Sequence, residues 1–131
     1  MPKIQMTSAA SFAIYHLQFL DEHGEKTQNF PAHITNDVLI TLYEKMLLTR
    51  LFDTKAINLQ RTGQLGTYPS CYGQEVIGAG IGYASTSDDV LVPYYREQAA
   101  LMMRGIDLAD VLSYWGGDER GSLYQGSPNQ Q

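Results

Sequence analysis

The pattern of hydrophobic and polar positions predicts a mainly helical chain built around one long amphipathic helix. Between Asp37 and Thr62 the sequence contains neither proline nor glycine, and apolar residues recur at steps of three and four. This period places them on one face of a helix, which we expect to be continuous and to pack against a partner element. Thr35 or Asn36 can cap its start, and Gly63 is placed to end it. The predicted apolar face consists of Leu39, Leu42, Tyr43, Met46, Leu47, Leu51 and Phe52, with Leu48 and Ile57 flanking it.

Shorter elements are predicted on both sides of this helix. Residues 12–20 are rich in aromatic and branched side chains and precede a polar bend at Gly24, which indicates a strand or a weak hairpin. A loop at residues 64–75 leads into a helix of small residues at about 74–85. The other expected elements are a short strand at residues 90–92, a helix at about residues 96–104 and a helix at residues 108–115.

Composition and charge narrow the class of protein. A chain of 131 residues with 44% hydrophobic residues suits a globular domain. We divide it into an N-terminal strand or hairpin extension with a linker, residues 1–35, and a main part, residues 36–131. The net charge of −5 disfavours binding to nucleic acid phosphates. No apolar run is long enough to span a membrane, and no signal or transit peptide pattern is present. With one cysteine, these features favour the cytoplasm.

Three features of the sequence receive mainly structural interpretations. Gly78, Gly80 and Gly82 lack the dinucleotide-binding spacing, and we expect them to let another helix pack close. Cys71 is far in the sequence from all three histidines, so a buried thiol is favoured over a nucleophile. Glu75 stands at the start of the small-residue helix, where a carboxylate is favoured. It can anchor a loop or support a neighbouring site, and a direct catalytic role is the least favoured reading.

Tyr95 and Arg96 follow the predicted short strand and are the strongest candidates for ligand binding. In open parallel sheets, ligands collect at the carboxyl ends of the strands. The arginine guanidinium is a planar fork of donors that matches phosphate oxygens, and a tyrosine adds a hydroxyl donor. The residues alone leave open a second reading, in which Arg96 is a structural ion-pair residue, for example with Glu97 or Asp118.

The order of these segments resembles a known family. Residues 46–75 read MLLTRLFDTKAINLQRTGQLGTYPSCYGQE, and residues 86–122 read TSDDVLVPYYREQAALMMRGIDLADVLSYWGGDERGS. Together they resemble the alpha subunit of the thiamine-diphosphate-dependent decarboxylase component of 2-oxo acid dehydrogenase complexes. The resemblance runs from about residue 12 to residue 122.

The resemblance implies that the parent protein has a thiamine-diphosphate-binding α/β fold, in which helices flank a parallel sheet. This chain is then expected to be a mostly helical part of that fold, with one or two short strands. It implies that Tyr95 and Arg96 bind the cofactor diphosphate. It assigns no catalytic residue and no metal ligand here, because the magnesium ligands are expected beyond residue 131. The implied partners are a beta subunit in an alpha2beta2 assembly and the lipoyl acyltransferase component. The loop-like C-terminal stretch leads us to expect an N-terminal piece that is inactive alone.

The loop GQLGTYPSCYGQE is similar to that of the pyruvate dehydrogenase branch, which makes pyruvate the first expected substrate. A branched-chain 2-oxo acid is the second, and acetoin is the third. From a different class of function, the alternative is a non-catalytic helical module that serves subunit contacts.

Overall fold

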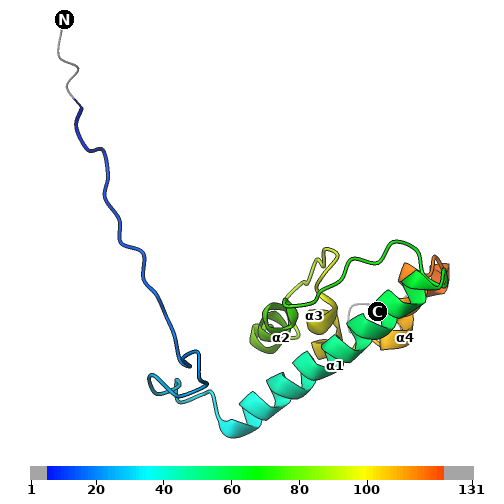
Figure 1. Ribbon diagram of the computed structural model, residues 1–131, viewed down its shortest axis with the longest axis horizontal. Helices are drawn as coiled ribbons and strands as arrows, with labels where there is room; N and C mark the ends of the chain where they lie inside the picture. The colour runs from blue at the N-terminus through cyan, green and yellow to red at the C-terminus, as the bar shows by residue number, and fades with distance from the viewer. Residues whose placement is uncertain (1–5, 123–131) are drawn as a thin grey trace, which may run out of the picture. The chain divides into compact units, whose positions relative to one another are not determined.

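A computed structural model describes residues 6–122, which belong to two units (Figure 1). The first unit comprises residues up to Ile34, and the second begins at Thr35. The second unit contains helices α1 (Asn36–Arg61), α2 (Glu75–Ala84), α3 (Gln98–Met103) and α4 (Leu108–Trp115), followed by a 3-10 turn at Glu119–Ser122. None of the helices in residues 6–122 has the length and apolar character that a membrane crossing requires.

The long helix α1 confirms the predicted continuous helix almost residue for residue. The side chain of Thr35 caps its start by accepting a hydrogen bond from the backbone N–H of Val38 at 3.4 Å. Gly63 follows its end with a φ of 74°, a left-handed conformation that glycine adopts without strain. The helix runs unbroken through Thr49 and Asp53.

The predicted buried face of α1 is wrong in part. The buried residues are Thr49, Phe52, Asp53 and Ala56. Leu51 is 60% exposed and Tyr43 is 65% exposed, although both lie on the expected apolar face. The buried face of α1 therefore carries smaller and more polar side chains than the predicted face. The reason is tertiary: this side of α1 meets Met102 of α3 and the loop that follows α1.

The two predicted strands do not form within residues 6–122, where the regular elements are helices. Residues 90–92 have no neighbouring strand to pair with in this part of the chain, and a strand needs a partner for its backbone groups. In the first unit, the predicted hairpin is reduced to a single antiparallel bridge between Leu20 and Lys26. The bend itself is present at Gly24, with a φ of 81°, and the Phe19 and Phe30 rings stack with centroids 5.2 Å apart.

Helices α2 and α3 pack against each other and against α1 (Figure 1). Two glycines on one face of α2 permit this close approach. A methyl group on Gly78 would lie 2.8 Å from Cβ of Ala99, and one on Gly82 would collide with the side chain of Met103. The prediction that these glycines serve helix packing is thus confirmed for Gly78 and Gly82. Gly80 faces open space instead.

The loop between α1 and α2 is anchored to α1 by the buried carboxylate of Asp53. Oδ1 accepts hydrogen bonds from the hydroxyl of Tyr68 at 3.0 Å and from the backbone N–H of Cys71 at 2.8 Å. Oδ2 accepts from the hydroxyl of Ser70 at 2.7 Å. The Tyr68 ring also packs edge-on against Phe52 and against Trp115 of α4, so the same loop joins α4 to the core. These contacts belong to a cluster of buried core residues: Phe52, Ala56, Tyr68, Met102 and Val111.

The first prediction concerns the α2–α3 contact. Gly78→Ala and Gly82→Ala should each destabilise the intact protein, because the added methyl group has no room without a shift of α3. Gly80→Ala is the matched control, and it should be neutral or stabilising by up to about 1 kcal/mol because alanine favours helix. Urea unfolding midpoints measure the difference. Equal effects at the three positions would contradict close packing at Gly78 and Gly82.

The second prediction concerns Asp53. Burial favours the neutral form of this group, but the hydrogen bonds from Ser70, Cys71 and Tyr68 outweigh it and hold the pKa of Asp53 below its usual value. A pKa that is lower in the folded state stabilises the protein above the unfolded value, about 3.9, and that stability is lost as the pH falls through the folded value. At pH 7, Asp53→Asn should therefore lower the free energy of unfolding by about 1–3 kcal/mol.

The difference between wild type and Asp53→Asn should shrink as the pH falls from about 5 toward 3, in urea titrations at each pH. Asp88→Asn, which changes an exposed carboxylate, serves as the control and should leave stability unchanged. A difference that stays constant over this pH range would show that the charge of Asp53 does not carry the effect.

Candidate functional site

Tyr95 and Arg96 lie in the turn that leads from the extended residues 90–93 into α3. The backbone N–H groups of Tyr94 and Arg96 both donate to the carboxylate of Glu97, at 2.8 and 3.1 Å. Glu97 thus closes the turn on itself and fixes the backbone of the two candidate residues. The Tyr94 and Tyr95 rings lie with centroids 4.1 Å apart, and Tyr95 is the more buried of the two.

The guanidinium of Arg96 is held by one backbone carbonyl. Its Nε donates to the carbonyl oxygen of Ser70 at 2.8 Å, and the guanidinium carbon lies 4.5 Å from the centre of the Tyr95 ring. Within residues 6–122, neither terminal nitrogen of Arg96 makes a hydrogen bond or an ion pair. The half-buried side chain therefore presents two donor nitrogens to a further acceptor.

The alternative reading of Arg96 as a structural ion-pair residue finds no support in the described part of the chain. The carboxylate of Glu97 is occupied by the backbone N–H groups of its own turn. Asp118 pairs with Arg120, whose Nε lies 2.9 Å from Oδ1. That pair is exposed on the arginine side, and it lowers the pKa of Asp118 to about 2. The acceptor of Arg96 is a neutral carbonyl, so its positive charge is not neutralised here.

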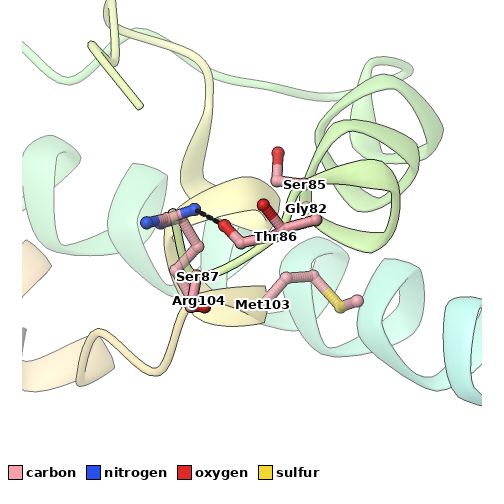
Figure 2. A pocket seen from close by; sticks show the side chains of 6 residues that line it. All are labelled: Gly82, Ser85, Thr86, Ser87, Met103 and Arg104. Carbon is pink, nitrogen blue, oxygen red and sulfur yellow. Dashed lines mark hydrogen bonds between the residues drawn. The ribbon is translucent and has the colours of Figure 1, made fainter. Parts of the chain in front are cut away.

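A second arginine, Arg104, holds the loop that precedes the candidate site. Figure 2 shows its guanidinium reaching from the end of α3 to the loop after α2, beside a hollow that is also lined by Ser85, Ser87 and Met103. Nη1 donates to the carbonyl oxygen of Thr86 at 3.1 Å, and Nη2 donates to that of Asp89 at 2.9 Å. Both terminal nitrogens of Arg104 are therefore used to hold the loop, and Arg104 is not a candidate ligand-binding residue.

The same loop is closed internally. The carboxylate of Asp89 accepts from the backbone N–H of Thr86 at 2.7 Å and from its hydroxyl at 3.0 Å. Four hydrogen bonds, two inside the loop and two from Arg104, therefore hold the segment from which the extended residues 90–93 start.

Glu75 has the structural role that its position allowed. It is 4% exposed and forms an ion pair with Arg50 of α1, which ties the start of α2 to α1. This bond with Arg50 lowers the pKa of Glu75, against the opposing effect of burial. The guanidinium of Arg50 also lies over the Tyr72 ring, 4.0 Å from its centre.

Cys71 is a buried thiol, as the sequence indicated. It is 1% exposed, and burial together with the nearby charge of Asp53 raises the pKa of its thiol to about 12. A thiol with this pKa is protonated at neutral pH and is a poor nucleophile. Its thiol donates to Oδ1 of Asp53 at 3.4 Å, and the negative charge of that carboxylate disfavours the thiolate.

The donors of the site suit an anionic ligand. Arg96 supplies a planar cation with two uncommitted terminal nitrogens in the described part of the chain, and Tyr95 beside it supplies a hydroxyl. Phosphate oxygens accept from donors of both kinds. A metal site is a separate matter: within residues 6–122, no three histidine, cysteine, aspartate or glutamate side chains come together in a way that could hold an ion.

Sequence reasoning missed the residues that support Arg96. Ser70 supplies a backbone carbonyl, and no side-chain pattern marks such an acceptor in advance. Asp53 did carry a signal, because it is a carboxylate next to Phe52, which lies on the predicted apolar face of the helix. Arg104 could not be assigned, since its acceptors are also backbone carbonyls.

Comparisons with known proteins agree with the resemblance seen in the sequence. The family described as "Dehydrogenase E1 component" matches residues 43–130. Pyruvate dehydrogenase E1 component subunit alpha of Staphylococcus epidermidis is 32% identical over 109 residues, which cover 82% of this chain and 30% of the relative. The 3-methyl-2-oxobutanoate dehydrogenase subunit alpha of Mycobacterium tuberculosis is 39% identical over the same length, with the same coverage.

The pyruvate dehydrogenase E1 component subunit alpha of Staphylococcus aureus is 30% identical, again over 109 residues. The chain spans about 30% of the length of the curated relatives it matches. No solved structure gives a significant match. Because the family match covers more than half of the sequence, this chain belongs to the dehydrogenase E1 component family, with alpha subunits of 2-oxo acid dehydrogenases as its relatives.

Proposed function

We propose that this chain forms one wall of the thiamine diphosphate site in the alpha subunit of a 2-oxo acid dehydrogenase, and that Tyr95 and Arg96 bind the cofactor diphosphate. One observation carries the proposal. Arg96 is tethered through Nε to the carbonyl oxygen of Ser70, which leaves both terminal nitrogens without a partner in the described residues. A cation that is oriented but not neutralised is suited to an anionic ligand.

The physical task of these residues is to hold a multiply charged diphosphate. Arginine meets two phosphate oxygens at once through its planar fork, and the adjacent Tyr95 hydroxyl can donate to a third oxygen. Magnesium would neutralise the remaining charge, with its ligands supplied outside residues 6–122. When bound, thiamine diphosphate would supply a nucleophilic ylide carbon and an electron sink for decarboxylation of a 2-oxo acid. The residues of this chain hold the opposite end of the cofactor.

The parallel-sheet α/β fold and the partners are part of the same proposal. In this proposal a beta subunit completes the active site in an alpha2beta2 assembly, and the acyl group passes to the lipoyl acyltransferase component. The exposed apolar side chains of α1, among them Tyr43 at 65% and Leu51 at 60%, support a subunit contact on that face. The free buried thiol of Cys71 agrees with a reducing compartment, and we place the enzyme in the cytoplasm.

Pyruvate is the proposed substrate, and a branched-chain 2-oxo acid is the second candidate. Two of the relatives described above carry pyruvate dehydrogenase in their names. The second candidate is favoured by a specific observation, because the relative named for 3-methyl-2-oxobutanoate has the higher identity, 39% against 32%. The two substrates differ in the size of the apolar group next to the 2-oxo carbon.

The third prediction tests the diphosphate role in the intact protein assembled with its beta subunit. Arg96→Lys keeps the charge but loses the fork, so the thiamine diphosphate concentration for half-maximal activity should rise about ten- to a hundredfold. Turnover at saturating cofactor should fall much less, because Arg96 does not contact the reacting carbon in this proposal. Tyr95→Phe should act in the same direction with a smaller effect.

Activity is measured against cofactor concentration with magnesium fixed, and Arg120→Lys is the control because it changes an exposed arginine paired with Asp118. The control should match the wild type. If Arg96→Lys lowered the maximal rate and left the cofactor dependence unchanged, the diphosphate role would be wrong.

The fourth prediction concerns the substrate. The assembled enzyme should turn over pyruvate with a higher kcat/KM than 3-methyl-2-oxobutanoate, since a pocket shaped for a methyl group rejects a branched one by steric overlap. The measurement is decarboxylation with an artificial electron acceptor for both acids under the same conditions. A preference for the branched acid would assign the protein to the second candidate function.

A further inference from the structure

Among residues 6–122, Ser70 joins the buried carboxylate of Asp53 to the candidate cofactor site. Its hydroxyl donates to Oδ2 of Asp53 at 2.7 Å, and its carbonyl oxygen accepts from Nε of Arg96 at 2.8 Å. The two contacts use the side chain and the backbone of one loop residue. Ser70 is only partly buried, so its position is set by these contacts more than by packing.

We propose that Asp53 is a positioning residue for Arg96 and that it acts through Ser70. The proposal rests on the proposed function, because it takes Arg96 as the diphosphate ligand. Asp53 contacts no ligand in this scheme. It fixes the Ser70 peptide, which in turn fixes the direction in which the two terminal nitrogens of Arg96 point.

The anchor is suited to this task by its place in the fold. Asp53 lies on the buried face of the unbroken helix α1, between the buried residues Phe52 and Ala56, and is 2% exposed. Its two oxygens accept from Ser70, Tyr68 and the backbone of Cys71. Hydrogen bonds to a charged acceptor are stronger than those between neutral groups, so the loop residues are held firmly. A rigid element thus determines the position of a loop carbonyl.

The benefit to the site is a preorganised arginine. Free arginine side chains sample many rotamers, and binding a ligand must pay for ordering them. A tether at Nε removes much of this freedom before the ligand arrives and leaves Nη1 and Nη2 for the phosphate oxygens. Loss of the tether should therefore weaken cofactor binding without changing the chemical step at the far end of the cofactor.

Three variants separate positioning from general stability. Ser70→Ala removes the hydroxyl that donates to Asp53 and accepts from the backbone N–H of Tyr72 at 3.2 Å, and it keeps the carbonyl that binds Arg96. Tyr68→Phe is the matched control, because it removes another donor from the same carboxylate but leaves the bond of Ser70 intact. Ser70→Thr keeps a hydroxyl at the same place and should rescue the effect of Ser70→Ala.

The experiment is calorimetric titration of thiamine diphosphate, at fixed magnesium, into the cofactor-free protein assembled with its beta subunit. Ser70→Ala should raise the dissociation constant about three- to tenfold, whereas Tyr68→Phe and Ser70→Thr should stay within about twofold of wild type. Turnover at saturating cofactor should be unchanged in all three variants. In the Arg96→Lys background, Ser70→Ala should add little further loss, since the tether to Nε is already gone.

The outcomes distinguish this proposal from the proposed function. If Arg96→Lys raises the dissociation constant but Ser70→Ala does not, Arg96 binds the cofactor and the positioning role of Asp53 is wrong. Equal losses in Ser70→Ala and Tyr68→Phe would assign Asp53 a merely structural role and also overturn it. If Arg96→Lys leaves the dissociation constant unchanged, the diphosphate role itself fails, and the positioning proposal is overturned with it.

Discussion

The buried carboxylate of Asp53 is the constraint on which this side of the molecule depends. A carboxylate that is 2% exposed is costly unless donors surround it, and the chain supplies them from the loop that follows α1. Satisfying that one charge forces Tyr68, Ser70 and Cys71 to fold back over the helix. The Tyr68 ring then enters the core between Phe52 and Trp115, which brings α4 into the same unit. A single polar requirement thereby organises an apolar core.

The segment that carries Tyr95 and Arg96 is held at both ends by different means. Before it, the loop after α2 is closed by Asp89 and clamped by Arg104. After it, α3 is locked against α2, because Gly78 lets the helices approach within contact of Ala99. Between these ends the backbone is fixed by Glu97, so the position of Arg96 does not depend on pairing in a sheet within the described residues. The absence of a strand at residues 90–92 in this part of the chain is compatible with an ordered site.

The sequence was sufficient for α1, because its length, its caps and the stop at Gly63 are all local properties. It was insufficient for the buried face of that helix. Leu51 and Asp53 are two positions apart, and hydrophobicity alone puts the wrong one inside. Only the three loop donors, which lie 15 to 18 residues further along the chain, make the aspartate the better buried residue. The predicted strands are absent from the described residues for a related reason, because a strand forms only when a second segment is available to pair with it.

In the candidate site, too, the sequence indicated some residues and not the contacts that hold them. Residue order and the resemblance pointed to Tyr95 and Arg96, but the acceptor of Arg96 is a backbone carbonyl 26 residues earlier, which no side-chain pattern reveals. In the loop that resembles the pyruvate branch, Tyr68, Ser70 and Cys71 are all used by Asp53, so these residues serve the fold. Under the proposed function, these residues hold the diphosphate end of the cofactor, which is common to enzymes for different 2-oxo acids. This agrees with identities of 32% and 39% to relatives named for different substrates. In the same proposal, selectivity for the acid arises where the substrate's carbon chain is held, at the other end of the cofactor from Arg96.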